Sequence, residues 1–331
     1  MSDFLLVTGG NGEVGHELIP QLKKLGKFKL ITLNLDGPDP ALVPYTDLAI
    51  KGNVLDKKLL KNLFSKYKIL GIFHLAAILS TSGEKDPEKA HQVNVEGTAN
   101  LLEVATMAKR PLKFIFPSTI AVYGIPDLQT KRKAKKVHEE EFNTPITMYG
   151  LNKLYCEMLG RYYSSYYRLL EDGPRFIDFR SVRFPGLISA TTLPSGGTSD
   201  FASEMIHAAA QGKPYESFVR ADTKIPFMAM PDAGMALIKL FLAPKEKLRR
   251  HVYNVRGFSP KASDFEMEIK IVYPKAKITY KPTTARQKIV DSWPEDLNDS
   301  AARRDWGWKA KFDFKKAFSE YLLPTISKRY K

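Results

Sequence analysis

The sequence contains very little cysteine and no long hydrophobic run. Cys156 is the only cysteine among 331 residues, which excludes an intramolecular disulfide. The longest apolar stretches fall far short of the roughly 20 residues that cross a bilayer, so we expect no membrane association. No charged-then-apolar leader precedes Phe4, where a strand-like run begins. These absences predict a soluble protein of the reducing cytoplasm.

Potential metal ligands are also scarce. The six histidines show no ligand spacing, and one cysteine cannot build a thiolate site, so we expect no metal. We interpret His74 as a packing residue that borders a cofactor rather than as an acid or base. We interpret Trp293, Trp306 and Trp308 as packing residues of the core or of a lid. We interpret Cys156 as a small buried hydrophobic residue.

Basic residues are in excess but are not concentrated in one place. The chain has 51 Lys and Arg against 36 Asp and Glu, a net charge of +15. Clustered Lys and Arg are typical of nucleic-acid binding, whereas the lysines here are scattered over expected helix surfaces. The one dense run, residues 131–136, is followed at once by Glu139, Glu140 and Glu141, which indicates a mixed-charge solvated loop. We therefore expect no nucleic-acid partner.

Strand-like and helix-like segments alternate along the first half of the chain, which indicates an α/β protein with a Rossmann-type, doubly wound parallel sheet. Beyond Pro185, glycine, proline and short mixed segments dominate, as in a smaller domain laid over the carboxyl edge of the sheet. We predict strands at 4–7, 30–35, 69–75, 113–116 and 177–183, and helices at 14–25, 57–66, 87–109 and 149–170.

Three glycines separate the first strand from the first helix. Gly9, Gly12 and Gly15 have the spacing that permits a tight turn and a close approach of the backbone to a pyrophosphate, beside the free N–H groups of a helix N-terminus. The motif predicts a dinucleotide-binding domain over residues 1–183. The remaining residues, 184–331, are expected to be mainly a substrate-binding domain.

The end of the second strand normally binds the adenosine ribose. Asn34 and Asp36 lie two residues apart, so on an extended strand they share a face and either can reach the ribose. Gly37 and Pro38 follow in place of a cation suited to a 2′-phosphate, which favours NAD over NADP. Further along, the pair Asn53 and Val54 can bracket the adenine, although a solvated turn is an open alternative.

Tyr149 and Lys153 begin an expected helix with the i, i+4 spacing that places both side chains on one face. A tyrosine with a pKa near 10 cannot act as a base at neutral pH unless a nearby cation stabilises its phenolate. Ser118 and Thr119 follow the strand at 113–116, and hydroxyls at a strand's carboxyl end belong in the active-site crevice of an α/β sheet.

Together with the motifs at 74–77, 93–98 and 183–186, these residues resemble the extended short-chain dehydrogenases. The loop at 195–200 and the segments at 222–226, 291–294 and 305–308 resemble, more narrowly, the L-threonine 3-dehydrogenases of that type. Departures are Asn34 and Asn53, where acidic residues are expected, and extra length at 131–138 and 170–175.

The resemblance implies oxidation of the L-threonine hydroxyl to 2-amino-3-oxobutyrate with reduction of NAD. In that scheme Tyr149 removes the hydroxyl proton, Thr119 orients the substrate oxygen with Ser118 as a less favoured substitute, and Lys153 lowers the tyrosine pKa and holds the nicotinamide ribose. Position in the family implies cofactor contacts at Leu75, Ala76, Asn94 and Pro185. It also implies substrate contacts at Ser80 and Thr198, for the carboxylate, and at Asp200, for the ammonium group.

Two other functions remain open at this stage. A nucleotide-sugar epimerase or dehydratase shares the glycine turn and the Tyr/Lys pair, but the loop at 195–200 and the segment at 291–294 argue against it. A catalytically silent NAD-binding regulator does not need the intact set of Thr119, Tyr149 and Lys153.

The resemblance also implies a homodimer in which the helices at 87–109 and 149–170 pair with their symmetry mates in a four-helix bundle. An aromatic stripe supports it, because its members fall three or four residues apart; these are Tyr155, Leu159, Tyr162, Tyr163 and Tyr166. The alternative is that the stripe packs wholly against the sheet.

Overall fold

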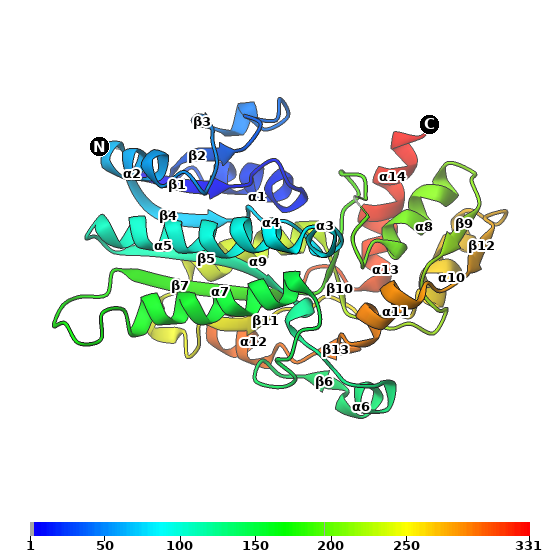
Figure 1. Ribbon diagram of the computed structural model, residues 1–331. Coiled ribbons are helices and arrows are strands. Elements are labelled where there is room, and N and C mark those ends of the chain that lie inside the picture. The colour runs from blue at the N-terminus through cyan, green and yellow to red at the C-terminus, as the bar shows by residue number, and fades with distance from the viewer. Residues whose placement is uncertain (1–2, 195) are drawn as a thin grey trace.

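A seven-stranded parallel sheet forms the centre of the molecule (Figure 1). The computed structural model describes residues 3–194 and 196–331. The strand order is β11-β7-β5-β4-β1-β2-β3, and every neighbouring pair runs parallel, so the predicted Rossmann-type fold is confirmed. These strands are β1 (Asp3–Thr8), β2 (Lys29–Asn34), β3 (Leu48–Lys51), β4 (Lys68–His74), β5 (Leu112–Thr119), β7 (Ile177–Phe184) and β11 (Val252–Asn254).

Helices cover both faces of the sheet. One face carries α2 (Lys57–Lys66), α5 (Gly97–Met107) and α7 (Met148–Ser165), and the other carries α1 (Glu13–Lys24) and α9 (Met230–Leu242) (Figure 1). Along β1, Leu5 and Val7 join the core on one face while Leu6 joins the core on the other. Side chains of a strand alternate between faces, so a sheet covered twice needs such an unbroken apolar run.

The helix predicted at 87–109 is divided. It consists of α4 (Pro87–His91), a π-helical turn at Gln92–Glu96, and α5, while the short helix α3 (Ser80–Lys85) precedes it. Single π-helical turns inside helices often mark functional positions. The helix predicted at 149–170 ends at Ser165, and within the described residues no helix is both long and apolar enough to cross a membrane.

The chain beyond β7 forms a smaller unit and also returns to the sheet. Helix α9 packs on α1, and β11 pairs with β7, so a single cut after residue 183 does not separate two domains. The other elements are β8 (Gly186–Ile188), α8 (Phe201–Ala210), β9 (Tyr215–Ser217), β10 (Phe227–Ala229), α10 (Ala262–Val272), β12 (Ile278–Tyr280), α11 (Thr284–Asp291), β13 (Asp296–Leu297), α12 (Ser300–Trp306), α13 (Phe314–Lys316) and α14 (Leu323–Arg329).

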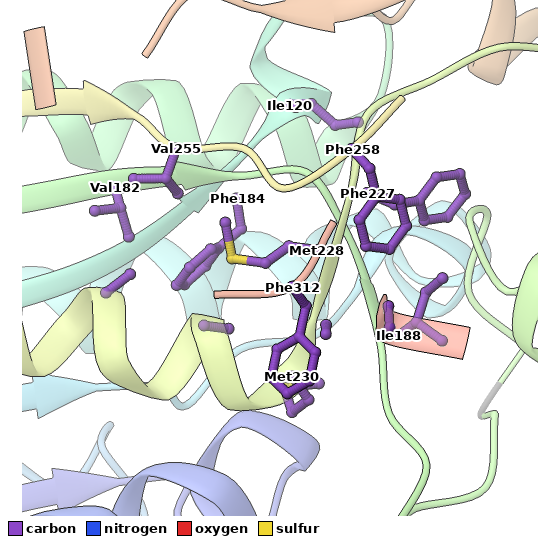
Figure 2. Packing of buried hydrophobic residues seen from close by; sticks show 14 of the residues in the cluster. Ile120, Val182, Phe184, Ile188, Phe227, Met228, Met230, Val255, Phe258 and Phe312 are labelled. Atoms are coloured by element: carbon purple, nitrogen blue, oxygen red, sulfur yellow. The ribbon is translucent and has the colours of Figure 1, made fainter. Parts of the chain in front are cut away.

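A buried hydrophobic cluster joins the sheet to this smaller unit. Figure 2 shows Val182 and Phe184 of β7 close to Met228 of β10 and to Val255, with Phe312 reaching in from the C-terminal segment. All five side chains are at least nine-tenths buried. Because residues from both sides of the expected boundary share one core, we expect the sheet and the smaller unit to unfold together.

The basic run at 131–136 is not the solvated loop that its charges suggested. Residues Leu128–Ala134 form helix α6, which Asp127 caps by accepting a hydrogen bond from the Thr130 amide at 2.8 Å. Lys131 is buried, and its Nζ donates to the Val290 carbonyl at 2.9 Å. The prediction was wrong because the aliphatic part of a lysine can be buried while its ammonium group finds a distant backbone acceptor.

Burial lowers the pKa of Lys131 to about 8, whereas an unfolded lysine titrates near about 10.4. At pH 7 both states are charged, and the native state bears the full desolvation cost. As the pH rises from about 8 to about 10, the folded lysine loses its proton first, so that cost disappears. We predict that Lys131→Met raises the free energy of unfolding by about 1–2 kcal/mol at pH 7 and that this gain vanishes near pH 10.

Urea unfolding at both pH values measures this difference. Lys133→Met is the matched control, because Lys133 lies exposed on the same helix. If Lys131→Met raised the free energy of unfolding equally at both pH values, the assignment of a buried, desolvated ammonium group would be contradicted.

Candidate active site

The glycine turn between β1 and α1 fits a pyrophosphate. Gly9 has a φ of +68°, and a Cβ added there would lie 2.5 Å from the amide nitrogen of Ala76. A Cβ on Gly15 would lie 2.0 Å from the Gly10 carbonyl oxygen. Gly12 is the N-cap residue of α1 and has no side chain to occupy the N–H groups of the first turn. No side chain of the N-cap residue therefore caps those N–H groups, which is the arrangement of helix N-termini that bind anions.

Asn34, and not Asp36, lies at the end of β2. The buried Asn34 accepts a hydrogen bond from the Asn11 amide at 3.0 Å, which ties the strand to the glycine turn. The Asn11 side chain donates to the Gly37 carbonyl at 2.7 Å and accepts from the Asp39 amide at 3.1 Å. Asp36 lies in the exposed turn beyond the strand, so the expected shared strand face is absent. Sequence reasoning missed Asn11, whose hydrogen bonds hold the segment after β2 against the glycine turn.

The predicted adenine residues follow β3. The Asn53 side chain accepts a hydrogen bond from the Leu55 amide at 3.0 Å, as in an Asx-turn. Val54 is buried against Gly97. The Asn53 side chain therefore shapes its own turn, and contact with the adenine remains a prediction.

Asn94 lies in the π-helical turn and is buried. Its side chain accepts from the Ile78 amide at 2.7 Å and donates to the Ile78 carbonyl at 3.0 Å. The amide thus fixes the segment that leads from β4 to Ser80. Leu75 and Ala76 lie at the start of that segment, where the Leu75 amide donates to the Thr8 carbonyl at 3.0 Å. Pro185 is buried between β7 and β8.

His74 and Cys156 are structural, as predicted. His74 lies between the hydroxyls of Thr8, at 2.7 Å, and Thr98, at 3.0 Å, and burial lowers its pKa to about 3. Burial raises the pKa of the Cys156 thiol to about 11, and this thiol donates to the Asn94 carbonyl. At neutral pH the imidazole is therefore uncharged and the thiol keeps its proton. Trp293 and Trp308 are buried in the core and Trp306 packs against it, in agreement with the prediction.

Thr119 and Tyr149 are brought together by the packing of α7. Thr119 ends β5, and its Oγ accepts a hydrogen bond from the Ala121 amide at 3.1 Å, which leaves the hydroxyl hydrogen to donate elsewhere. Thr147 caps α7 by accepting from the Gly150 amide at 3.1 Å. A Cβ on Gly150 would lie only 2.0 Å from the Ala121 carbonyl oxygen. The helix turn that carries Tyr149 therefore touches the turn that follows Thr119.

The charges of Tyr149 and Lys153 are set by burial. Burial raises the pKa of Tyr149, so the phenol is protonated at neutral pH. Burial lowers the pKa of Lys153 to about 8, and its Nζ donates to the Pro117 carbonyl at 2.7 Å and lies 5.8 Å from the centre of the Tyr149 ring. The lowered tyrosine pKa that the sequence predicted is not present in this arrangement, because the ammonium group points to a carbonyl rather than to the phenol.

Ser118 and two charged residues form a buried network that the sequence reasoning missed. The Ser118 hydroxyl donates to Glu157, which also forms an ion pair with Arg183. The buried Ser118 hydroxyl already donates its hydrogen to Glu157, which makes it a poor substitute for Thr119. The i, i+4 spacing of Tyr149, Lys153 and Glu157 was a signal that could have revealed Glu157.

The predicted substrate residues meet between α3 and the loop before α8. The hydroxyls of Ser80 and Thr198 lie 3.1 Å apart. Asp200 accepts from the Gly197 amide at 2.7 Å, and Ser195 of the same loop lies outside the described residues. Thr81 and Arg286 both donate to the Gly196 carbonyl, at 2.7 and 3.2 Å, so two distant elements hold this loop.

Glu13 adds a carboxylate that the sequence reasoning did not consider. It begins α1, and burial, reinforced by the charge of Asp200, raises its pKa to about 7. The glycine turn and the loop at 196–200, which carries the predicted substrate residues, therefore approach each other through these two acidic side chains. Among the described residues, no group of three or more His, Cys, Asp or Glu is arranged to hold a metal ion.

Comparison with known proteins decides the family. The model of the NAD dependent epimerase/dehydratase family matches residues 5–255. This chain belongs to that family. The L-threonine 3-dehydrogenase of Bos taurus, described as mitochondrial, is 35% identical over 317 residues, which cover 93% of this chain and 79% of the relative.

Two solved structures are also similar to this family member. A monomeric L-threonine 3-dehydrogenase from a metagenome database has 36% identity and a TM-score of 0.87, and the match covers 99% of this chain and 100% of that one. The L-threonine dehydrogenase of Clostridium difficile has 31% identity and a TM-score of 0.88, with 99% of both chains covered. The resemblance to threonine dehydrogenases and the use of NAD, both predicted from the sequence, are confirmed.

We predict that Gly9→Ala weakens NAD binding at least about tenfold, because the added methyl group collides with the Ala76 backbone and displaces the turn. Gly26→Ala is the matched control: Gly26 has a φ of +65°, but a Cβ there meets nothing within 4 Å. The positive φ alone should cost each variant about 1 kcal/mol of stability, and Gly9→Ala should lose more because of the collision. Calorimetric titration with NAD separates them, and equal affinities for the two variants would contradict the role of the turn.

Proposed function

We propose that this chain oxidises the 3-hydroxyl of L-threonine to 2-amino-3-oxobutyrate, with bound NAD accepting the hydride. The observation that carries the proposal is the contact of Gly150 with the Ala121 carbonyl, which brings the Tyr149 helix turn against the turn after Thr119. Both lie at the carboxyl edge of the sheet, where the glycine turn also opens. The similarity to threonine dehydrogenases over almost the whole chain supports the choice of substrate.

Each catalytic side chain has one task in this scheme. Thr119 donates its hydroxyl hydrogen to the substrate oxygen, and Tyr149 removes the proton from that oxygen. Because burial raises the pKa of Tyr149, the phenol needs a cation beside it to ionise. Lys153 supplies that cation from the same helix face, and it would also hold the nicotinamide ribose. Before the phenol ionises, the hydrogen bond to the Pro117 carbonyl holds the ammonium group in place.

The substrate loop supplies recognition of the amino acid. Ser80 and Thr198 are buried hydroxyls that share a hydrogen bond, and we assign them to the carboxylate, which both can donate to once that mutual bond opens. Asp200 supplies a negative charge for the ammonium group. On the cofactor side, we assign Asn34 to the adenosine ribose, since Asp36 is exposed beyond the strand.

We predict that Tyr149→Phe retains NAD affinity and lowers kcat with threonine by at least about a thousandfold, because the proton acceptor is lost while the ring remains. Tyr155→Phe is the matched control, since it removes the same hydroxyl from an exposed position on the same helix. Absorbance of NADH measures both. Wild-type turnover by Tyr149→Phe would contradict the assigned base.

A substrate panel tests the proposal against its nearest rival. Wild-type protein with NAD is given L-threonine, UDP-glucose or UDP-galactose, and both NADH formation and sugar interconversion are followed. We expect NADH with threonine alone. Interconversion of the two sugars would instead support a nucleotide-sugar epimerase.

We also propose a homodimer formed through α5 and α7. Support comes from the exposed aromatic stripe on α7: Tyr155 is 53%, Tyr162 43% and Tyr166 42% exposed, so the stripe does not pack wholly against the sheet. Of the five residues of the stripe, Leu159 and Tyr163 are the two that pack against the core. Exposed apolar surfaces of this kind usually mark interfaces. Because Tyr149 begins the same helix, a partner would also steady the catalytic pair.

We predict that the wild type sediments at twice its monomer mass of 37.4 kDa at micromolar concentration. Met158→Glu should produce monomers, because it places a charge beside Tyr155 and Tyr162 of the stripe, where Met158 is 51% exposed. Ile271→Glu is the matched control on α10, at a residue that is 72% exposed away from the stripe. A wild type that is fully active as a monomer would rule the dimer out.

A cytoplasmic location completes the proposal. The single buried cysteine is consistent with a reducing compartment. The bovine relative is mitochondrial, which shows that related enzymes also work in an organelle. Fluorescence microscopy of the tagged full-length protein in its source cells distinguishes the two.

A further inference from the structure

A buried ion pair lies directly behind the catalytic residues. The carboxylate of Glu157 accepts from Arg183 Nε at 2.9 Å and from Nη2 at 2.6 Å, and it also accepts from the Ser118 hydroxyl. Glu157, Arg183 and Lys153 are 1%, 2% and 3% exposed. A buried ion pair adds little net stability over an apolar replacement, so stability alone does not explain three such residues at this position.

The pair connects every element that carries a catalytic group. Glu157 lies on α7 one helical turn after Lys153 and two turns after Tyr149. Ser118 immediately precedes Thr119 on β5, and Arg183 is the neighbour of Ser118 on β7. A single carboxylate therefore holds the helix that carries the base and the strand that carries Thr119 at a fixed separation.

We propose that Glu157 is a positioning residue for the reaction: it sets the register of α7 against β5 and keeps Lys153 charged beside Tyr149. This rests on the proposed dehydrogenase function. The negative charge of Glu157 acts on Lys153 along the helix, because a carboxylate one turn away favours the ammonium form of a buried lysine. The hydrogen bond from the Ser118 hydroxyl to Glu157 holds α7 in register with β5.

The charge of Lys153 depends on its burial and on the groups around it, of which Glu157 is one. Burial lowers the pKa of Lys153, and the negative charge of Glu157 acts against that fall. Arg183 faces the same carboxylate from β7, so removal of Glu157 would also leave an unpaired cation nearby. The groups that face Lys153 are Tyr149, Cys156 and Glu157 from its own helix, His74 from β4, and the Phe116 ring and Pro117 carbonyl from β5.

The test is the pH dependence of kcat/KM for threonine in Glu157→Gln. Loss of the carboxylate should let Lys153 lose its proton at lower pH, so Tyr149 loses its cation and ionises at higher pH. We expect the midpoint of the acidic limb to move up by about one unit and kcat at pH 7 to fall about tenfold. KM for threonine and the Kd for NAD should change less than about threefold.

Glu139→Gln is the matched control. Glu139 is also buried, and its carboxylate lies 2.9 Å from Arg250. Its backbone carbonyl accepts from Arg183 at 2.7 Å, a bond that the substitution keeps, but its carboxylate touches neither Glu157 nor Lys153. We expect this variant to lose thermal stability as Glu157→Gln does, with an unchanged pH profile. Should Glu157→Gln fail to fold, Glu157→Asp carries the test. It keeps the charge but shortens the reach to Ser118, so kcat should fall about fivefold with the midpoint unmoved.

Two outcomes would overturn the positioning role. One is a wild-type midpoint and kcat in folded Glu157→Gln or, if only the aspartate variant folds, a wild-type kcat there. The other is an equal shift of the midpoint in Glu139→Gln. Wild-type protein assayed in parallel keeps this result apart from the proposed function: no threonine-dependent NADH from the wild type would refute the dehydrogenase activity itself.

Discussion

The close packing of α7 against β7 and against the turn that follows β5 is the constraint on which the site depends. The helix can approach the sheet only where it carries no side chain. A Cβ at Gly150 would lie 2.0 Å from the Ala121 carbonyl oxygen, and one at Gly160 would lie 2.2 Å from the Phe179 ring. Interiors are close-packed and cannot absorb such overlaps cheaply. The two glycines therefore determine how near Tyr149 comes to Thr119.

This packing also determines the charges of the site. Contact with the sheet removes Lys153 and Glu157 from water, and the pKa of Lys153 is lowered as a result. Lys153 is held by the Pro117 carbonyl, and Glu157 by Ser118 and Arg183. A site built in this way has little freedom to reorganise, which favours preorganised catalysis. The smaller C-terminal unit shares a buried core with the sheet (Figure 2). Ala190 and Phe201 belong to that core, so the loop between them is anchored on both sides.

Features with a local sequence signal were predictable. The residues of the glycine turn are close together in the sequence, and so are Tyr149 and Lys153, so spacing alone predicts the geometry of each. The alternation of strands and helices is likewise read from short segments. The neutral role of His74 was also predictable, since no second ligand or acid accompanied it. The parallel sheet followed from the repeated strand and helix pattern, although β11 escaped notice because only three residues form it.

Features that depend on distant partners were not predictable. The acceptor of Lys131 is the carbonyl of Val290, so a lysine within a basic run gave no sign that it would be buried. Asp36 falls beyond the strand because the chain turns after Asn34, and that turn is fixed by the distant side chain of Asn11. The π-helical turn at Asn94 likewise requires the backbone of Ile78. Such contacts arise only once the fold has formed.

The central claim is that the hydride leaves the carbon that bears the threonine hydroxyl. The most direct measurement uses L-threonine deuterated at that carbon, incubated with NAD and the wild-type protein, followed by mass spectrometry of the nicotinamide product. The account predicts NADH that carries the deuterium and is formed more slowly than from unlabelled threonine. NADH without deuterium, or no NADH at all, would contradict it.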